Sequence, residues 1–314
     1  MKGKLKDYLL LYSKGLAMGA ADVVPGVSGG TIAFISGIYQ TLLDSIKSFD
    51  GKALRLLFQF KLSELWAHVN GTFLLVLLAG IGTSILSLSK LILYLLKNEP
   101  IVIWSFFFGL IIASTVLVFK EVKNKSLIMV WVSAIIGALI AFLITRATPA
   151  ETPEAYWFIF ISGAIAICAM ILPGISGSFI LVLMVKYEFI LQSLQAFNLP
   201  VIITFASGCV VGLLSFAHLL SYLLKQYHDL TVSLLAGFMV GSLYKVWPWK
   251  QALETYIDRH GEVKPLVEQN LMPWVFQETT GQNPKWLLSL IFLIVGLALV
   301  LVIEYFASRR QSVG

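Results

Sequence analysis

The sequence predicts an all-α polytopic membrane protein that consists of two inverted repeats, each a re-entrant helical hairpin plus three transmembrane helices. The first observation is composition: 58% of the 314 residues are hydrophobic and only 13% are charged, whereas a soluble domain carries roughly a quarter charged residues. The second is length, because several apolar segments reach the roughly 20 residues with which an α-helix crosses the hydrocarbon core. The third is an internal repeat built around a break in an apolar segment.

The charged residues and the cysteines exclude several other classes of protein. A net charge of +6 would suit a nucleic-acid partner, but in a membrane protein excess Lys and Arg belong to cytoplasmic loops and anionic lipid surfaces. We therefore expect a membrane and no nucleic acid. Cys168 and Cys209 lie in apolar segments without a Cys-x-x-Cys spacing, which is typical of small core residues. The sequence predicts no metal site and no cofactor.

The repeat is anchored by two breaks of small residues, Pro25-Gly26-Val27-Ser28-Gly29-Gly30 and Pro173-Gly174-Ile175-Ser176-Gly177-Ser178. Each break is followed by an apolar run that ends in a tyrosine. The first half also contains an extra polar, amphipathic stretch, which we expect to lie along the membrane surface. The correspondence continues along both halves and pairs Tyr39 with Tyr187, Gly80 with Gly208, and Gly109 with Gly237.

We expect the first repeat over residues 1–147 and the second over residues 148–314. The first repeat comprises a re-entrant hairpin at 9–48, the amphipathic insertion at 51–70, and spans at 71–96, 101–119 and 127–145. The second comprises a re-entrant hairpin at 156–195, spans at 200–225 and 231–247, an extracytoplasmic loop at 248–285, and a last span at 286–307.

Charge between these segments sets the predicted orientation, because Lys and Arg are retained in cytoplasmic loops. If each broken segment crossed the membrane completely, the acidic connector 147–155 would share a side with the basic amino terminus. If each broken segment enters and leaves on one side, the two halves have three crossings each and are inverted. Every basic loop then falls inside. We therefore predict six crossings, two opposed hairpins and both termini in the cytoplasm.

The two breaks predict a binding site near the middle of the membrane. Unpaired backbone groups cost several kcal/mol each in hydrocarbon, so an irregular turn survives there only against protein or a polar cavity. Helix N-termini with open N–H groups, flanked by serine hydroxyls, would suit an anion, phosphate above all. The alternative is that the small residues only allow tight hairpin packing. The candidate residues are Pro25, Gly26, Ser28, Gly29, Gly30 and Thr31 in the first break and Pro173, Gly174, Ser176, Gly177 and Ser178 in the second.

Three ionisable residues inside apolar segments are further candidates, since charge at that depth is costly and usually functional. Asp22, which corresponds to Met170 in the second half, could bind a coupling cation or proton and gate the cycle. It could equally cap a helix or pair with a lysine. Lys90 and its counterpart His218 could meet the ligand with positive charge. Alternatively, Lys90 extends to the interface and His218 is an ordinary hydrogen-bonded histidine.

Three charged residues are expected near the membrane interfaces. Lys186 and Glu188 flank Tyr187 at the far end of the second hairpin, where an interfacial ion pair is the favoured interpretation. Lys245 precedes the aromatic segment 247–249, so we expect it near the outer interface as an anchor or a headgroup contact.

These motifs resemble those of a bacterial family long catalogued as a domain of unknown function and now assigned to polyprenyl-phosphate translocases. The resemblance spans nearly the whole chain and rests on residues 18–22 (Met-Gly-Ala-Ala-Asp), 25–31, 171–178 and 247–250 (Trp-Pro-Trp-Lys). It implies that the protein returns undecaprenyl phosphate, the carrier lipid of cell-wall synthesis, from the outer to the inner leaflet of the bacterial cytoplasmic membrane. It also implies that Asp22 and the two Pro-Gly-x-Ser-Gly turns are the functional positions. His218 departs from the family pattern, because many relatives are expected to have arginine there.

Two other functions stay open on the residues alone. A small-anion transporter or channel would use the same open N–H groups. Undecaprenyl-pyrophosphate phosphatases resemble this layout, but Gly29 and Gly177 stand where their motif has arginine. The sequence also lacks a Glu cluster or a neighbouring histidine for acid–base chemistry. We therefore predict a lipid transporter and not an enzyme. A homo-oligomer is compatible with the sequence.

Overall fold

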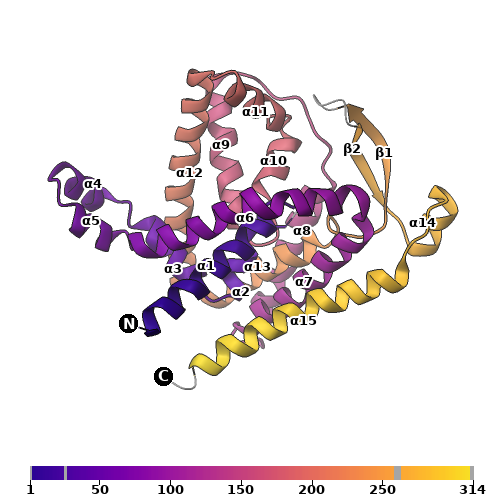
Figure 1. The fold of residues 1–314 in the computed structure, drawn as a ribbon, viewed down its shortest axis with the longest axis horizontal. Coiled ribbons are helices and arrows are strands. Elements are labelled where there is room, and N and C mark those ends of the chain that lie inside the picture. Colours follow the sequence, from indigo (N-terminus) through magenta and orange to yellow (C-terminus); the bar gives the residue numbers. More distant parts are fainter. Residues whose placement is uncertain (1, 25–26, 258–262, 312–314) are drawn as a thin grey trace.

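The computed structural model describes residues 2–24, 27–257 and 263–311, and over them the chain is overwhelmingly helical (Figure 1). This confirms the predicted all-α polytopic class. Two candidate site residues, Pro25 and Gly26, lie outside the described residues.

The first half of the chain forms helices α1 to α8. The amphipathic insertion becomes two short helices, α4 and α5, which project from the body of the molecule (Figure 1). Asp50 caps α4 by accepting hydrogen bonds from the backbone N–H groups of Lys52 and Ala53, both at 2.9 Å. The bounds are α1 Lys2–Asp22, α2 Gly29–Ile35, α3 Tyr39–Lys47, α4 Gly51–Phe58, α5 Leu62–His68, α6 Gly71–Asn98, α7 Pro100–Lys120 and α8 Ile128–Arg146.

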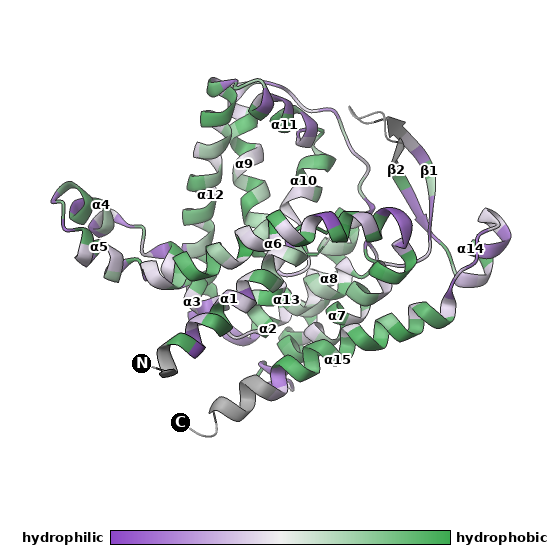
Figure 2. Ribbon diagram, viewed as in Figure 1, coloured by the Kyte–Doolittle hydropathy of each residue, from purple (hydrophilic) through white to green (hydrophobic). Residues whose placement is uncertain are grey.

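The second half repeats the order of the main helices and adds a small sheet. Its bounds are α9 Tyr156–Ile171, α10 Gly177–Leu183, α11 Tyr187–Gln195, α12 Leu199–Gln226, α13 His228–Ser242, β1 Lys250–Ile257, β2 Val263–Asn270, α14 Pro273–Thr280 and α15 Trp286–Gln311. Hydrophobic residues dominate α12, α9 and α15, whereas hydrophilic residues gather in the β-hairpin and α14 (Figure 2).

Within the described part of the chain, five helices are long and apolar enough to cross a membrane: α6, α7, α8, α12 and α15. Helices α10 and α11 would provide a sixth span if taken together, but they meet at 103°. The crossing expected at 231–247 corresponds to α13, whose 15 residues fall short of the roughly 20 that span the hydrocarbon core.

The helices pack in pairs that correspond between the two halves. Helix α1 lies against α6 as α9 lies against α12, and α7 packs on α15 as α13 packs on α8. Gly80 of α6 faces the backbone of α1, and its counterpart Gly208 faces the backbone of α9. Because lipid supplies no hydrophobic force between helices, such close backbone approach at small residues is a main source of their association.

Polar contacts join helix ends from different halves at both ends of the molecule. At one end, Lys225 of α12 pairs with Asp44 of α3 at 3.5 Å, and Asp229 accepts from the backbone N–H of Asn124 at 2.8 Å. At another, Lys285 before α15 pairs with Glu99 between α6 and α7 at 2.6 Å. The ends of α12 and α3 are thus held together, separately from the ends of α6 and α15.

The segment expected as an extracytoplasmic loop, 248–285, contains more structure than the sequence suggested. Strands β1 and β2 form an antiparallel hairpin with a register irregularity near Glu254, followed by α14. Two tryptophans fasten the segment: Trp247 donates to the carbonyl of Leu271 and Trp249 to that of Pro284, both at 2.8 Å. Two short polar strands lack the sustained alternation that identifies a sheet from sequence.

A close backbone contact at Gly80 yields a stability prediction. A Cβ at Gly80 would collide with the carbonyl oxygen of Tyr12, whereas a Cβ at Gly82, in the same helix, would meet nothing within 4 Å. We expect Gly80→Ala to destabilise the protein by about 1–3 kcal/mol through overpacking. Gly82→Ala is expected to be neutral or slightly stabilising, because alanine favours the helix. Thermal unfolding in detergent measures both, and equal unfolding temperatures would contradict the packing.

Candidate functional site

At the first break, side chains of the same half accept hydrogen bonds from the backbone N–H groups at the start of α2. Helix α1 ends at Asp22, and its carboxylate Oδ1 accepts a hydrogen bond from the backbone N–H of Gly29 at 2.7 Å. Ser28 has an extended backbone and caps α2 by accepting from the N–H of Gly30 at 3.0 Å. A Cβ at Gly29 would stand 2.6 Å from the other carboxylate oxygen of Asp22. A larger residue at position 29 would therefore require the Asp22 carboxylate to shift from this helix end.

The second break is more open. Gly174 has a φ of +85° and lies against the backbone of α13 at Phe238 and Met239, a conformation and a spacing that favour glycine. Ser176 starts α10 without a side-chain cap, and its hydroxyl instead shares a 2.8 Å hydrogen bond with that of Ser178. No described residue accepts a hydrogen bond from the backbone N–H of Gly177 or Ser178.

The two breaks lie in direct contact, although more than 140 residues separate them. The Ser28 hydroxyl donates to the Met170 carbonyl at 2.8 Å, with a sequence separation of 142. The backbone N–H of Gly174 donates to the Thr31 hydroxyl at 3.2 Å. Side chains of the first half therefore satisfy backbone groups that the break in the second half leaves free.

Tyr39 also belongs to the junction of the two breaks, although the sequence alone did not mark it as a site residue. Its hydroxyl donates to the carbonyl of Ile171, the last residue of α9, at 3.1 Å. It is 4% exposed, whereas its repeat partner Tyr187 is 39% exposed. The repeat had paired these tyrosines, but it could not show that only one is buried at the junction.

The hydroxyl groups of the junction are withdrawn from the surface. Ser28 and Thr31 are each 1% exposed and Ser176 is 5% exposed. They lie beside the main apolar core, which includes Val27 and Ile175 from the two breaks. The expectation of open N–H groups at both helix N-termini is thus corrected for the first break, because the N–H groups of Gly29 and Gly30 are already bonded. Among the described residues, the N–H groups without an acceptor belong to the second break.

Lys90 and His218 are not brought to the junction. Both side chains lie in exposed positions on long helices, α6 and α12. The His218 Nδ1 is 2.8 Å from the carbonyl oxygen of Leu214, one turn earlier in its own helix. The structure therefore gives neither residue a contact with the two breaks.

Lys186 does not form the expected ion pair with Glu188. It is only 2% exposed, and its ammonium donates to the carbonyl of Thr152 at 2.7 Å. It also stands 5.8 Å and 5.6 Å from the ring centres of Phe158 and Phe189. A buried ammonium group needs such partners, and the connector 147–155 provides the acceptor.

Lys245 lies at the start of the segment that follows α13, and it is engaged by protein. Its ammonium is 2.9 Å from the carboxylate of Glu268 in β2 and 4.9 Å from the ring centre of Phe179 in α10. Lys250 reaches the same carboxylate at 3.5 Å. Sequence reasoning missed Lys250 and Glu268 as partners, because a charged residue in a loop carries no local sign of burial.

Among the described residues, no three His, Cys, Asp or Glu side chains lie together as a metal site requires. The polar chemistry at the junction of the two breaks is therefore that of hydroxyl groups, backbone N–H groups and one carboxylate. Groups of these kinds are suited to hold an anion or a proton.

Comparison with known proteins shows a clear relationship. A family model described as undecaprenyl phosphate translocase-like matches residues 18–264. A polyprenyl-phosphate transporter of Vibrio cholerae is 49% identical over 310 residues, which cover 98% of this chain and all of the relative. A polyprenyl-phosphate transporter of Staphylococcus aureus is 32% identical over 252 residues, covering 75% of this chain and 84% of the relative. No solved structure matches significantly.

The hydrogen bond between Thr31 and Gly174 allows a test of the junction. Thr31→Val keeps the side-chain shape but leaves the buried N–H of Gly174 without its acceptor, so we expect a loss of about 1–3 kcal/mol of stability. Thr115→Val is the matched control, because the Thr115 hydroxyl donates to a carbonyl of its own helix, that of Ile111. Thermal unfolding of both variants decides the matter. An equal effect of the two substitutions would argue against the contact between the breaks.

Proposed function

The chain belongs to the undecaprenyl phosphate translocase-like family, and on that premise we propose that it transports undecaprenyl phosphate or a similar polyprenyl phosphate. The proposed direction is from the outer to the inner leaflet of the bacterial cytoplasmic membrane, which recycles the carrier lipid for cell-wall synthesis. The observation that carries the proposal is the direct contact between the two broken segments of the two halves.

The proposed phosphate site lies at this junction. The backbone N–H groups of Gly177 and Ser178, at the start of α10, have no acceptor among the described residues, and the hydroxyls of Ser176 and Ser178 stand beside them. Open N–H groups at a helix start, together with hydroxyl donors, match the oxygens of a phosphate monoester. The pieces come from broken helices, as they do in transporters whose substrate sites lie where two repeats meet.

Asp22 is proposed to gate this site. Its carboxylate occupies the N-terminus of α2 through the N–H of Gly29, so it holds the position that a phosphate oxygen would take. Two anions at one helix end repel each other. Phosphate can therefore use the first break only after Asp22 is protonated or displaced, and this links the cycle to a proton or a cation.

Sidedness in the structure supports inverted repeats. Segments predicted to be cytoplasmic contact one another, as in the pairs Lys225–Asp44 and Lys120–Glu304. Segments predicted to be outside also contact one another, as in the pair Lys285–Glu99. This arrangement is the one expected if α6 and α12 run in opposite directions through the membrane. Two opposed hairpins would then let one site face each leaflet in turn.

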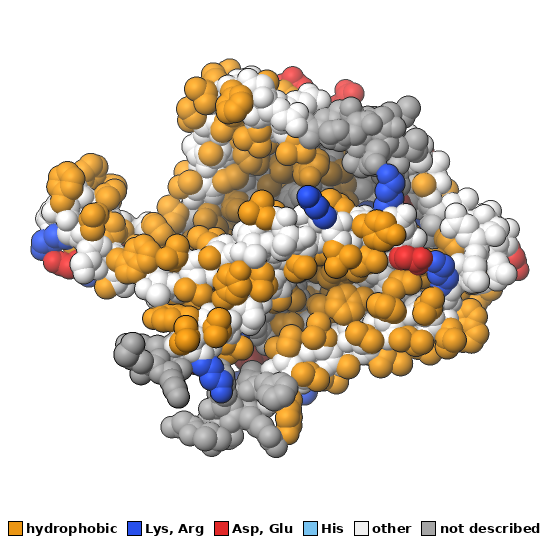
Figure 3. Space-filling model, in the orientation of Figure 1, with side chains coloured by type: hydrophobic (Ala, Val, Ile, Leu, Met, Phe, Trp, Pro, Cys, Tyr) orange, Lys and Arg blue, Asp and Glu red, His pale blue; other side chains and the backbone are white. Residues whose placement is uncertain are grey.

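The surface also suits an amphiphilic substrate. One face of the molecule is hollowed between α12 and α10, above α6, and hydrophobic side chains line the hollow with a basic side chain at its rim (Figure 3). An opening of this kind would allow the isoprenoid tail to stay in lipid while the headgroup reaches the protein.

Reconstitution in liposomes tests the site directly. We expect Ser176→Leu to reduce the inward movement of labelled polyprenyl phosphate at least about tenfold, because the leucine removes a hydroxyl donor and fills the site. Ser207→Leu, on an exposed surface of α12, should transport normally. Since Ser176 is buried, Ser176→Ala is measured as well, and it should fold normally and transport poorly.

Unchanged transport by both Ser176 variants would refute the site. If wild-type protein moves inorganic phosphate and ignores the lipid, the function is small-anion transport. If it releases phosphate from the pyrophosphate lipid, the protein is an enzyme.

Asp22→Asn tests the gate. The amide oxygen of asparagine can still accept from the N–H of Gly29, but the titratable charge is gone. We expect transport by this variant to lose its dependence on a pH gradient, and measurement of rates at two gradients shows this. Asp44→Asn, which alters a carboxylate in the ion pair with Lys225, should respond to pH like the wild type. A gradient response of Asp22→Asn equal to that of the wild type would rule out a coupling role.

A further inference from the structure

We propose that Lys245, Lys250 and Glu268, the lysine cluster, form a second phosphate-binding site beside the β-hairpin, and that the aromatic pocket next to it receives the first isoprene units of the same lipid. This inference rests on the proposed function and deepens it. It identifies a place where the substrate is held before it reaches the junction of the two breaks.

The lysine cluster joins three separate parts of the fold. The Lys245 ammonium is 2.9 Å and the Lys250 ammonium 3.5 Å from the carboxylate of Glu268. Lys250 also lies 4.2 Å from the ring centre of Trp104 in α7. Its side chain is 8% exposed, and those of Lys245 and Glu268 are 20% and 23% exposed. The charges are thus largely withdrawn from solvent and held against aromatic rings.

The lysine cluster has an excess of positive charge. Two ammonium groups share one carboxylate, so one positive charge has no partner within the cluster. Burial lowers the pKa of Lys250 to about 8, against the opposing effect of Glu268. Burial raises the pKa of Glu268, but the two ammonium groups outweigh it and hold that pKa below its usual value. A buried excess charge is costly, and an anionic ligand would remove that cost.

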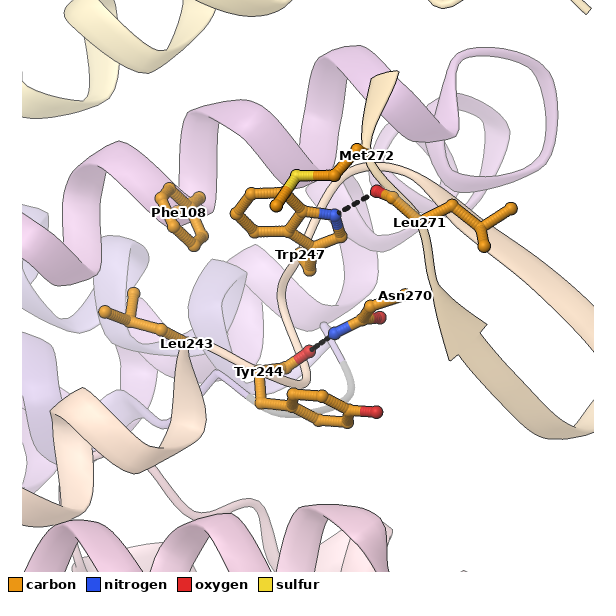
Figure 4. Close-up of a pocket in the computed structure, with 7 residues that line it drawn as sticks. All are labelled: Phe108, Leu243, Tyr244, Trp247, Asn270, Leu271 and Met272. Atoms are coloured by element: carbon orange, nitrogen blue, oxygen red, sulfur yellow. Dashed lines mark hydrogen bonds between the residues drawn. The ribbon is translucent and has the colours of Figure 1, made fainter. Parts of the chain in front are cut away.

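An apolar pocket of about 370 Å³ is lined by residues of α7, of the segment after α13 and of the end of β2 (Figure 4). Its volume lies within the range of sites that enclose small molecules. The Trp247 indole and the Asn270 amide are fixed by hydrogen bonds to the carbonyls of Leu271 and Tyr244, at 2.8 Å and 2.7 Å. The apolar lining comes mainly from Phe108, Leu243, Tyr244, Trp247, Leu271 and Met272.

The same three segments, α7, β2 and the segment after α13, contribute residues to or beside both the lysine cluster and the pocket. On α7, Trp104 under Lys250 and Phe108 in the pocket are four residues apart and so share a helix face. On β2, Glu268 and Asn270 are two residues apart and so share a strand face. After α13, Tyr244 in the pocket directly precedes Lys245. A charged site and an apolar pocket side by side match one ligand with an anionic head and a hydrocarbon tail.

The cluster also leads to the junction of the two breaks. Lys245 stands over the ring of Phe179, and Phe179 directly follows Ser178 at the start of α10. By the predicted orientation, the β-hairpin faces the outside. A lipid phosphate bound at the lysine cluster would therefore lie on the outer side of the protein. It would be close to the start of α10, where the N–H groups of Gly177 and Ser178 lie.

In this proposal Glu268 occupies the place that the phosphate would take. Substitutions of the lysines and of Glu268 should therefore change the affinity for the phosphate in opposite directions. Lys250→Gln and Lys245→Gln each lower the cluster's charge from +1 to neutral, and we expect each to weaken binding at least about tenfold, the effect of one lost hydrogen bond between charged groups. Glu268→Gln raises the charge to +2, and we expect it to tighten binding about threefold or more. A purely structural ion pair would give loss of stability in all three and a gain of affinity in none.

Binding is measured on purified full-length protein with a short-chain polyprenyl monophosphate, the matching neutral polyprenol and inorganic phosphate. The Ser176→Leu background disables the proposed junction site, so the remaining affinity reports the cluster. Lys285→Gln is the matched control, because Lys285 also pairs with a glutamate, Glu99, and neither residue lines the pocket. Lys250→Arg keeps the charge and should restore most of the binding.

Unchanged affinity in both lysine variants, or weaker binding in Glu268→Gln, would overturn the proposal. If the neutral polyprenol bound as tightly as the polyprenyl monophosphate, the cluster would not recognise the phosphate. If inorganic phosphate bound as tightly as the polyprenyl monophosphate, the pocket would not recognise the isoprenoid tail. Failure of the proposed function is distinct, since wild-type protein would then not move the lipid at all. If the wild-type protein moves the lipid and Lys250→Gln moves it at the same rate, this inference fails while the proposed function stands.

Discussion

The fold depends on how two interrupted helices satisfy their backbone groups in a medium without water. Each break leaves N–H and C=O groups that hydrocarbon cannot pair, at a cost of several kcal/mol per group. The structure meets this constraint across the halves, because Ser28 donates to the Met170 carbonyl and Thr31 accepts from the N–H of Gly174. The second break thus relies on side chains of the first half, whereas the first break is capped by Asp22 and Ser28 of its own half.

The two halves share this scaffold without being equivalent. The first break is capped internally by the Asp22 carboxylate, while the second has Met170 at the corresponding position and leaves its helix start open. Tyr39 is buried at the junction, and Tyr187 is exposed. A symmetric pair of anion sites would bind phosphate equally from either side. In the proposed function, the asymmetry instead separates a half that binds phosphate from a half whose carboxylate responds to phosphate or protons.

A carboxylate stands at both proposed phosphate positions. Asp22 occupies the helix start of α2, and Glu268 lies between two lysines beside the β-hairpin. In each case an internal anion keeps donors or ammonium groups satisfied while no ligand is bound, because such groups are costly to bury unpaired. Exchange of an internal carboxylate for a phosphate changes little net hydrogen bonding. Such an exchange suits transport, which requires a substrate to be held and then released.

The sequence by itself determined the membrane class, the order of the main helices and the position of both breaks. These follow from hydropathy and from Pro and Gly, which act over a few residues whatever the rest of the chain does. The paired tyrosines and glycines also indicated the repeat. The short polar strands β1 and β2 had no comparable sequence pattern.

Only the tertiary structure decided which polar groups are already paired. Asp22 meets the N–H of Gly29 across a turn, Lys186 meets the connector before α9, and Lys250 meets Glu268 across a hairpin. A charged residue looks the same in sequence whether its partner is water or a buried carboxylate. The open helix start at Gly177 and the positive cluster at Lys250 therefore emerge only once distant segments are packed together.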